Sequence, residues 1–157
     1  MENLDKLEFI AKVDMTHRDY ETALASLTEA QLLQPRTCGE WTVKDVMAHI
    51  TWYEREMIGV LKECALVGSD LWNLPLDSRN AAIYAEIKDH PLSEILNESK
   101  QIHQTMLELL EELTDDDLLH ASRFREIPPA WIPWQVIASN TFEHYPVHTA
   151  DIRKVFY

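Results

Sequence analysis

Apolar residues recur every three or four positions along four long stretches of this chain. The stretches run from Leu4 to Leu27, from about 42 to 66, from Pro91 to Leu113 and from about 134 to 155. This spacing places the apolar side chains on one face of an α-helix, whereas a half-buried strand would show alternation at every second position. The pattern therefore predicts an all-α protein in which four amphipathic helices pack as a four-helix bundle, with no sheet.

The segments between these stretches carry the signals that begin and end helices. Residues 67–91 form a long connection with a glycine and two prolines, and we expect a short accessory helix within it, from Ser78 to Lys88. A proline-rich loop is expected over 121–133, before the fourth helix. Thr42 stands where its side chain can cap the second helix. Thr114, followed by three aspartates, marks a further helix start, because negative charge is favourable at a helix N-terminus.

Composition and charge predict one cytoplasmic domain. The 157 residues are 46% hydrophobic with only three glycines, so we expect a single domain over 1–157 with one core. The formal net charge of −13 argues against a nucleic acid partner, because such binding depends on Lys and Arg. The first residues lack the features of a secretory signal and no apolar run approaches membrane-spanning length, so no membrane partner is expected. Cys38 and Cys64 form no Cys-x-x-Cys pair, which is typical of free thiols in a reducing compartment.

Two of the seven histidines lie on the inward face of the predicted fourth helix. His144 and His148 are one helical turn apart, near the centre of its apolar stripe. Two imidazoles in this arrangement can share a metal ion, which also supplies the partner that a buried polar ring needs. Pro146 lies between them and cannot donate the helical hydrogen bond to Phe142. We therefore expect a kink that changes the angle between the two rings.

A third imidazole can come from the second helix. His49 lies near the edge of that helix's apolar stripe, and three neutral imidazoles would leave a divalent ion, zinc or nickel, with open positions for water or substrate. His17 and His103 also lie near apolar stripes, so each can be a core residue, a support for the ligands or a replacement ligand. His90 and His120 fall in expected loops, where solvent exposure explains them.

Two short segments, GEWTVKDVMAH at 39–49 and EHYPVH at 143–148, contain these three histidines. They resemble the DinB-like superfamily, which includes the YfiT-type metal-dependent hydrolases and the bacillithiol and mycothiol transferases. The resemblance implies a four-helix bundle, often a homodimer, with a three-histidine metal site. Its ligands in this chain would be His49, His144 and His148.

The histidines and the resemblance together indicate a metal-dependent enzyme. The expected reaction is hydrolysis or thiol S-transfer on a small-molecule substrate, for example a low-molecular-weight thiol, with the metal polarising the substrate or lowering the pKa of bound water or thiol. Asp45, Glu56 and Asp151 are the candidate catalytic carboxylates, because they lie close in sequence to the three histidines. All three are expected on exposed helix faces.

Two features leave the substrate and the reaction open. Many members of the family continue the last histidine with arginine, a small residue and glutamine, whereas this chain has Thr149-Ala150-Asp151. The loop at 121–133 has the length of an active-site lid, and its Arg123 and Arg125 can hold an acidic substrate or only offset nearby negative charge. The alternative function is a non-enzymatic bundle that binds a metal or small ligand and acts through its dimer in a stress response.

Overall fold

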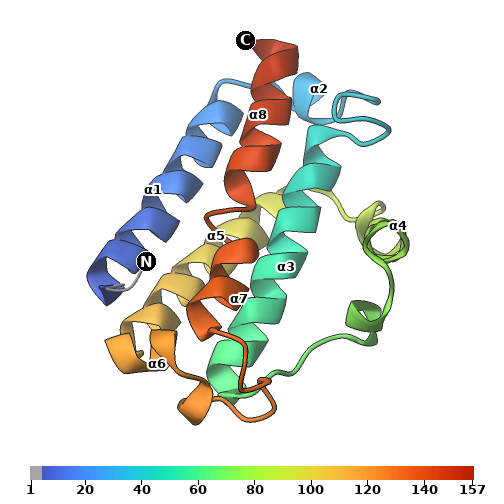
Figure 1. Ribbon diagram of the computed structural model, residues 1–157. Coiled ribbons are helices and arrows are strands. Elements are labelled where there is room, and N and C mark those ends of the chain that lie inside the picture. The colour runs from blue at the N-terminus through green and yellow to red at the C-terminus, as the bar shows by residue number, and fades with distance from the viewer. Residues whose placement is uncertain (1–4) are drawn as a thin grey trace.

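The computed structural model describes residues 5–157 and is all-α (Figure 1). Its long helices are α1 (Lys6–Ala25), α3 (Val43–Glu63) and α5 (Leu92–Glu111), and α7 (Pro133–Ser139) with α8 (Tyr145–Phe156) fills the fourth position of the bundle. The shorter elements are α2 (Glu29–Leu32), η1 (Asp70–Asn73), α4 (Leu76–Ile87), α6 (Asp115–Leu119) and η2 (Ala121–Arg123). Between residues 5 and 157 the only β pairing is two isolated bridges, so the predicted all-α class is confirmed.

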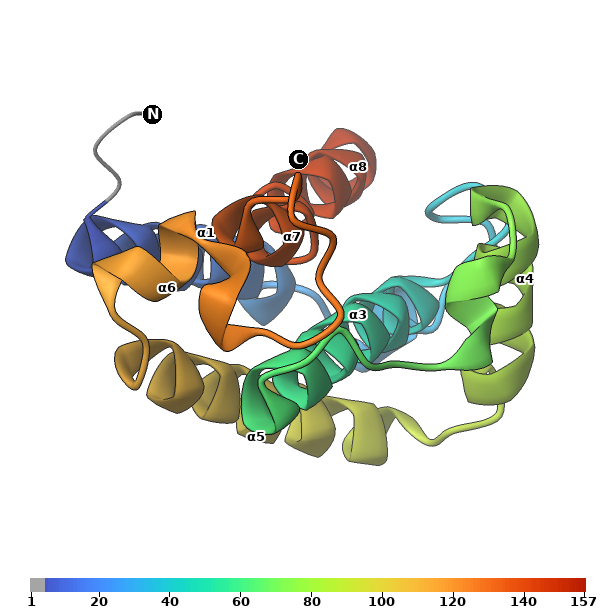
Figure 2. The same cartoon turned by 60° about the horizontal axis from the view of Figure 1, so that its bottom comes forward.

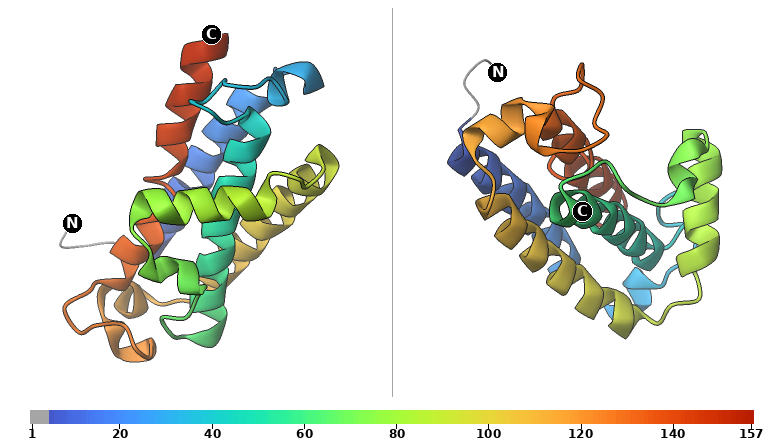
Figure 3. Two further views of the ribbon diagram at one scale, coloured as in Figure 1. Left: turned by 90° about the vertical axis from the view of Figure 1, so that its right-hand side faces the viewer. Right: turned by 90° about the horizontal axis from the view of Figure 1, so that it is seen from below.

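Helix α3 lies at the centre of the bundle. It packs along α5 on one side and contacts α4 and α8 on others, while α1 packs along α8 and α5. Figures 2 and 3 show α3 between α1 and α4. Twelve consecutive residues, 43–54, are buried on α3, which is more than one amphipathic face. A helix surrounded in this way can present side chains to the interior in several directions, and this positions the polar clusters described below.

Side-chain caps begin three of the helices where the sequence has a threonine. Thr42 accepts a hydrogen bond from the Asp45 amide while the Asp45 carboxylate accepts from the Thr42 amide, 2.9 Å away. Thr28 and Thr114 make the same reciprocal arrangement at α2 and α6. The predicted helix starts at Thr42 and Thr114 are therefore confirmed. Each cap satisfies backbone N–H groups that a helix N-terminus otherwise leaves without partners.

The predicted fourth helix over 134–155 is wrong as one continuous helix. It is divided into α7 and α8 by turns at residues 140–144. Pro146 lies in the first turn of α8, where its missing N–H costs no helical hydrogen bond. At the end of α7, the side-chain amide of Asn140 donates a hydrogen bond of 2.8 Å to the Val136 carbonyl. The chain therefore restarts its helix at Tyr145 in place of bending a continuous one. The first predicted helical stretch starts at Leu4, which lies outside the described residues.

The long connection between α3 and α5 forms an arm beside α3, on the side away from α1 (Figure 3). The accessory helix expected from Ser78 to Lys88 is present as α4. The carboxylate of Glu56 fixes the start of the arm by accepting hydrogen bonds from the Ser69 amide and the Trp72 indole, each 2.7 Å long. A Cβ at Gly68 would lie 2.5 Å from that carboxylate, so this close approach requires glycine.

None of the described helices is long and apolar enough to cross a membrane.

Candidate metal centre

Three histidines from two parts of the bundle turn the same ring nitrogen toward one point. His49 comes from the middle of α3, His144 is the residue immediately before α8, and His148 lies one turn into α8. The Nε2 atom of His144 is 3.1 Å from that of His49 and 2.9 Å from that of His148. Ligand atoms of all three residues lie within 4.8 Å of one another. The break before α8 thus brings the two C-terminal rings together and does not separate them.

The number of protons that these nitrogens can share favours a metal ion over a hydrogen-bonded cluster, although both distances also suit a hydrogen bond. Two nitrogens that bind one tetrahedral zinc at about 2.0–2.1 Å lie roughly 3.3 Å apart, close to the spacing seen here. A neutral imidazole nitrogen carries either one proton or one lone pair. The Nε2 of His144 can therefore satisfy only one of its two neighbours, His49 or His148. A cation at their common centre would satisfy all three lone pairs at once.

Burial keeps the three rings neutral, which is the form that binds metal. Desolvation by burial, followed by repulsion from the other two rings, lowers the pKa of His49 to about 2. Burial and the nearby His148 lower the pKa of His144 to about 3. Burial also lowers the pKa of His148, and the negative charge of Asp151 opposes that shift. The lone pairs are thus available throughout the neutral pH range.

Aromatic side chains form the walls around the three histidines. The Tyr53 ring lies 4.9 Å from the His49 ring and 5.1 Å from the His144 ring, measured between centroids. Trp41 lies 5.1 Å from His49 on another side. The Nδ1 atoms of His49 and His144 have no hydrogen-bond partner among residues 5–157. Ring packing, and not a hydrogen bond to Nδ1, therefore fixes the orientation of these two imidazoles.

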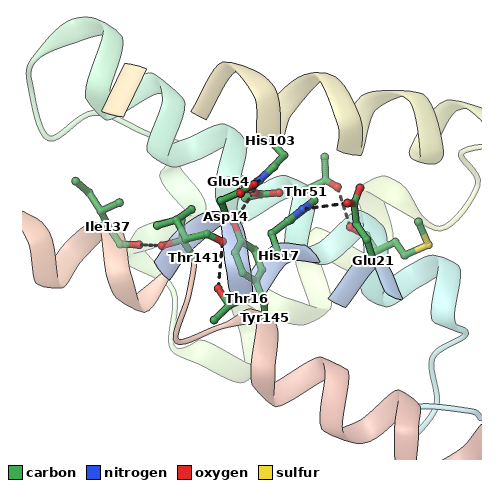
Figure 4. Close-up of polar contacts among 12 residues, drawn as sticks. Asp14, Thr16, His17, Glu21, Thr51, Glu54, His103, Ile137, Thr141 and Tyr145 are labelled. Carbon is green, nitrogen blue, oxygen red and sulfur yellow. Dashed lines mark hydrogen bonds and ion pairs between the residues drawn. The ribbon is translucent and has the colours of Figure 1, made fainter. Parts of the chain in front are cut away.

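A second buried polar cluster lies between α1, α3, α5 and α8 (Figure 4). It contains His17, Glu54, His103 and Tyr145. The Tyr145 hydroxyl donates to the fully buried Glu54 carboxylate at 2.5 Å, and the His103 Nδ1 lies 3.3 Å from the same oxygen. The ring of His17 stacks on that of His103, with centroids 3.4 Å apart and planes 5° apart. Burial and the nearby His103 lower the pKa of His17 to about 3.

Sequence reasoning missed Glu54 and Tyr145. A signal for Glu54 was present, because it lies four residues after Ile50 and three before Met57, on the apolar stripe of α3. A carboxylate on such a stripe is buried and needs a partner. Its partners come from helices distant in sequence, and no spacing rule identifies them.

The three candidate carboxylates do not converge on the histidines. Asp45 is buried and not exposed as expected, and its carboxylate is used in the Thr42 cap. Glu56 is half-buried and holds the arm in place through the bonds described above. Asp151 is the one that is exposed, and its charge acts on His148 and on the Cys38 thiol, whose pKa is raised chiefly by burial.

The arginines of the 121–133 loop are used in structural contacts. Arg123 pairs with Asp117 at 2.9 Å and so supports the cap at Thr114, and Arg125 donates to the Glu63 carbonyl. The sequence left two roles open for these arginines, and both contacts favour compensation of local negative charge over binding of an acidic substrate. Trp131 in the same loop is half exposed.

The fold and the histidines define a class of protein, an all-α bundle with a candidate three-histidine centre. The sequence matches the family model of the DinB superfamily over residues 12–151, so the chain belongs to the DinB superfamily. The comparison with curated protein sequences gave no match.

Solved structures share the fold at low sequence identity. A protein from Streptococcus pneumoniae is similar with a TM-score of 0.80 and 16% identity, over 99% of this chain and 93% of that one. An uncharacterised protein from Escherichia coli UTI89 has a TM-score of 0.78 and 16% identity, over 98% and 93%. The colibactin self-resistance protein ClbS, in complex with a dsDNA, has a TM-score of 0.78 and 15% identity, over 96% and 94%. At such identities the likeness shows the fold alone.

The exclusion of nucleic acid partners from net charge was wrong. ClbS has this fold and was crystallised with double-stranded DNA. A net charge of −13 is a sum over the whole chain, whereas contacts with phosphates depend on the local arrangement of cations on one face. Neither the fold nor the total charge therefore removes nucleic acid from consideration.

Proposed function

We propose that this protein is a metal-dependent enzyme whose divalent ion is held by His49, His144 and His148 and whose substrate is a small molecule. The observation that carries the proposal is the convergence of the three Nε2 atoms, with His144 3.1 Å and 2.9 Å from the other two. Three protein ligands leave further coordination positions open, as in catalytic and not structural zinc sites. Zinc and nickel both suit an all-imidazole donor set.

The residues around the centre support hydrolysis or transfer of a thiol group. A bound divalent ion lowers the pKa of a coordinated water or thiol and so supplies a nucleophile at neutral pH. The rings of Trp41 and Tyr53 exclude water from two sides of His49, which is only 3% exposed. Electrostatic interactions with a reacting group are stronger in such a partly dry setting.

Metal content and turnover in the same preparation test this proposal. Elemental analysis of gently purified protein should give about one divalent ion per chain. A panel of thiol-transfer and ester substrates should show turnover that a chelator abolishes and that added zinc or nickel restores. Protein that binds the ion but turns over no substrate would favour the non-enzymatic metal-binding alternative, and protein without the ion would refute both.

The homodimer stays a prediction that rests on the family resemblance. Light scattering at micromolar concentration should report twice the mass of one 18.3 kDa chain. A monomer there would contradict it.

A further inference from the structure

A pocket of about 580 Å³ lies between α3, the arm that begins at Leu66, α4 and α7. Half of its lining residues are apolar or aromatic, among them Met57, Val60, Trp72, Trp131 and Val136. Sites for drug-sized ligands have volumes of about 300–1,000 Å³ and linings of this kind, with a few polar groups that fix orientation. The pocket is therefore large enough for a small organic molecule.

The pocket begins one aromatic ring away from the candidate metal centre. Tyr53, whose ring lies against His49 and His144, also contacts Trp72 edge to face, with centroids 5.5 Å apart. Trp72 in turn lines the pocket and is held by its bond to Glu56. A molecule lying against Trp72 would thus be placed beside the wall of the metal centre.

Arg79 is the cationic group of this pocket. Its Nε donates to the Tyr53 hydroxyl at 3.1 Å, and its guanidinium lies 4.6 Å from the Trp72 ring centroid. Arg79 makes no ion pair with any described carboxylate, and its two Nη groups make no hydrogen bond within residues 5–157. An unpaired, half-buried guanidinium is unusual in a chain with 27 acidic residues and 14 lysines and arginines. Its planar fork matches a carboxylate in shape and charge.

We propose that this pocket binds an organic monoanion with a planar aromatic body, and that Arg79 pairs with its carboxylate. The body would lie against Trp72 and Trp131, whose rings offer large apolar faces. Asp70 lies on the exposed rim, and its negative charge disfavours a ligand with several negative charges. As an assignment of substrate class the inference rests on the proposed function, but binding to the pocket itself requires no metal.

Two probes of equal size and different charge test the role of Arg79. Calorimetric titration with 2-naphthoate and with 2-naphthamide, in protein treated with chelator, should show about tenfold or more tighter binding of the carboxylate. In Arg79→Gln this preference should fall to nearly one, and in Arg79→Lys, which keeps the charge but loses the fork, it should be intermediate. Arg55→Gln is the matched control, because Arg55 is exposed on α3 and pairs with Glu98 outside the pocket. It should leave the preference unchanged.

Each other outcome overturns the inference. Equal binding of the two probes to the unaltered protein, no measurable binding of 2-naphthoate, or an unchanged preference in Arg79→Gln would show that the pocket does not recognise an organic anion through Arg79. Circular dichroism of each variant confirms that the helices are intact. Since the titrations use metal-free protein, they succeed or fail independently of whether the three histidines hold an ion.

Discussion

The two buried histidine clusters contain similar residues but direct their ring nitrogens differently. In the cluster of His49, His144 and His148, the Nε2 atom of His144 lies 3.1 Å from that of His49 and 2.9 Å from that of His148. At His17 and His103 the rings lie flat on each other, with planes 5° apart. A nitrogen lone pair lies in the plane of its ring, so two parallel rings cannot both point at one ion unless they tilt apart. The presence of ligand residues within reach therefore does not by itself define a metal site.

The groups that surround the two clusters differ as well. The cluster at His17 is organised by hydrogen bonds, since Glu54 accepts from Tyr145 and lies beside the Nδ1 of His103. The cluster at His49 is organised by ring packing, with aromatic walls on two sides. This contrast indicates that the cluster at His17 serves to hold four helices together and that the cluster at His49 is available to bind an ion.

The largest expected difference is in metal content. The double variant of His144 and His148 to alanine should lose nearly all of the roughly one ion per chain, because a single imidazole remains. The double variant of His17 and His103 to alanine should keep it. Elemental analysis after gel filtration measures both, and His90→Ala is an exposed control. If the His17 and His103 variant lost the ion and the other kept it, the assignment of the two clusters would have to be exchanged.

The next effect concerns stability. Tyr145→Phe removes the hydroxyl that donates to the fully buried Glu54 carboxylate, so it should lower the free energy of unfolding by about 1.5–3 kcal/mol. Tyr84→Phe is the matched control, because the Tyr84 hydroxyl makes no hydrogen bond in the described part of the chain, and its effect should stay within about 0.5 kcal/mol. Urea denaturation of metal-free protein gives both values. Equal effects would mean that the Glu54 hydrogen bond contributes nothing to the fold.

Particular residues show how far the sequence could predict this structure. The helix starts at Thr42 and Thr114 and the accessory helix α4 followed from local signals, since caps and apolar spacing act over one or two turns. The break at 140–144 did not, because apolar spacing continues across it and only Pro146 hints at the restart. The contacts of Glu54 and Arg79 depend on which helices pack together, and local patterns do not contain that information.

The pH dependence of stability tests the burial of His17 in its cluster. The pKa of His17 is about 3 in the folded protein and about 6.5 in an unfolded chain. Between these values the unfolded state binds one more proton than the folded state, so His17 makes the protein less stable as pH falls through this window. In His17→Gln the slope of the unfolding free energy between pH 6 and 4.5 should be smaller by about 1.4 kcal/mol per pH unit. Urea denaturation across this range measures it, and an unchanged slope would show that His17 protonates in the folded state.

The smallest expected effect is at Asp151, an exposed carboxylate whose negative charge acts on His148 in the candidate metal centre. Its negative charge favours a cation at the three histidines, but an exposed charge is screened by solvent and contributes less than about 1 kcal/mol. Asp151→Asn should therefore weaken zinc binding less than about fivefold, whereas His148→Ala removes a ligand.

Competition with a chelating dye measures the zinc affinity, and Asp116→Asn is the control, since Asp116 is exposed and lies beside His120. A loss of zinc from Asp151→Asn as large as that from His148→Ala would make Asp151 a fourth ligand. If Asp151→Asn retained all its zinc but lost turnover, Asp151 would instead have the catalytic role expected from its closeness in sequence to His148. A small loss of zinc with turnover unchanged would mean that the three imidazoles are the protein's only ligands to the ion. The two clusters would then differ in metal binding as the directions of their ring nitrogens predict.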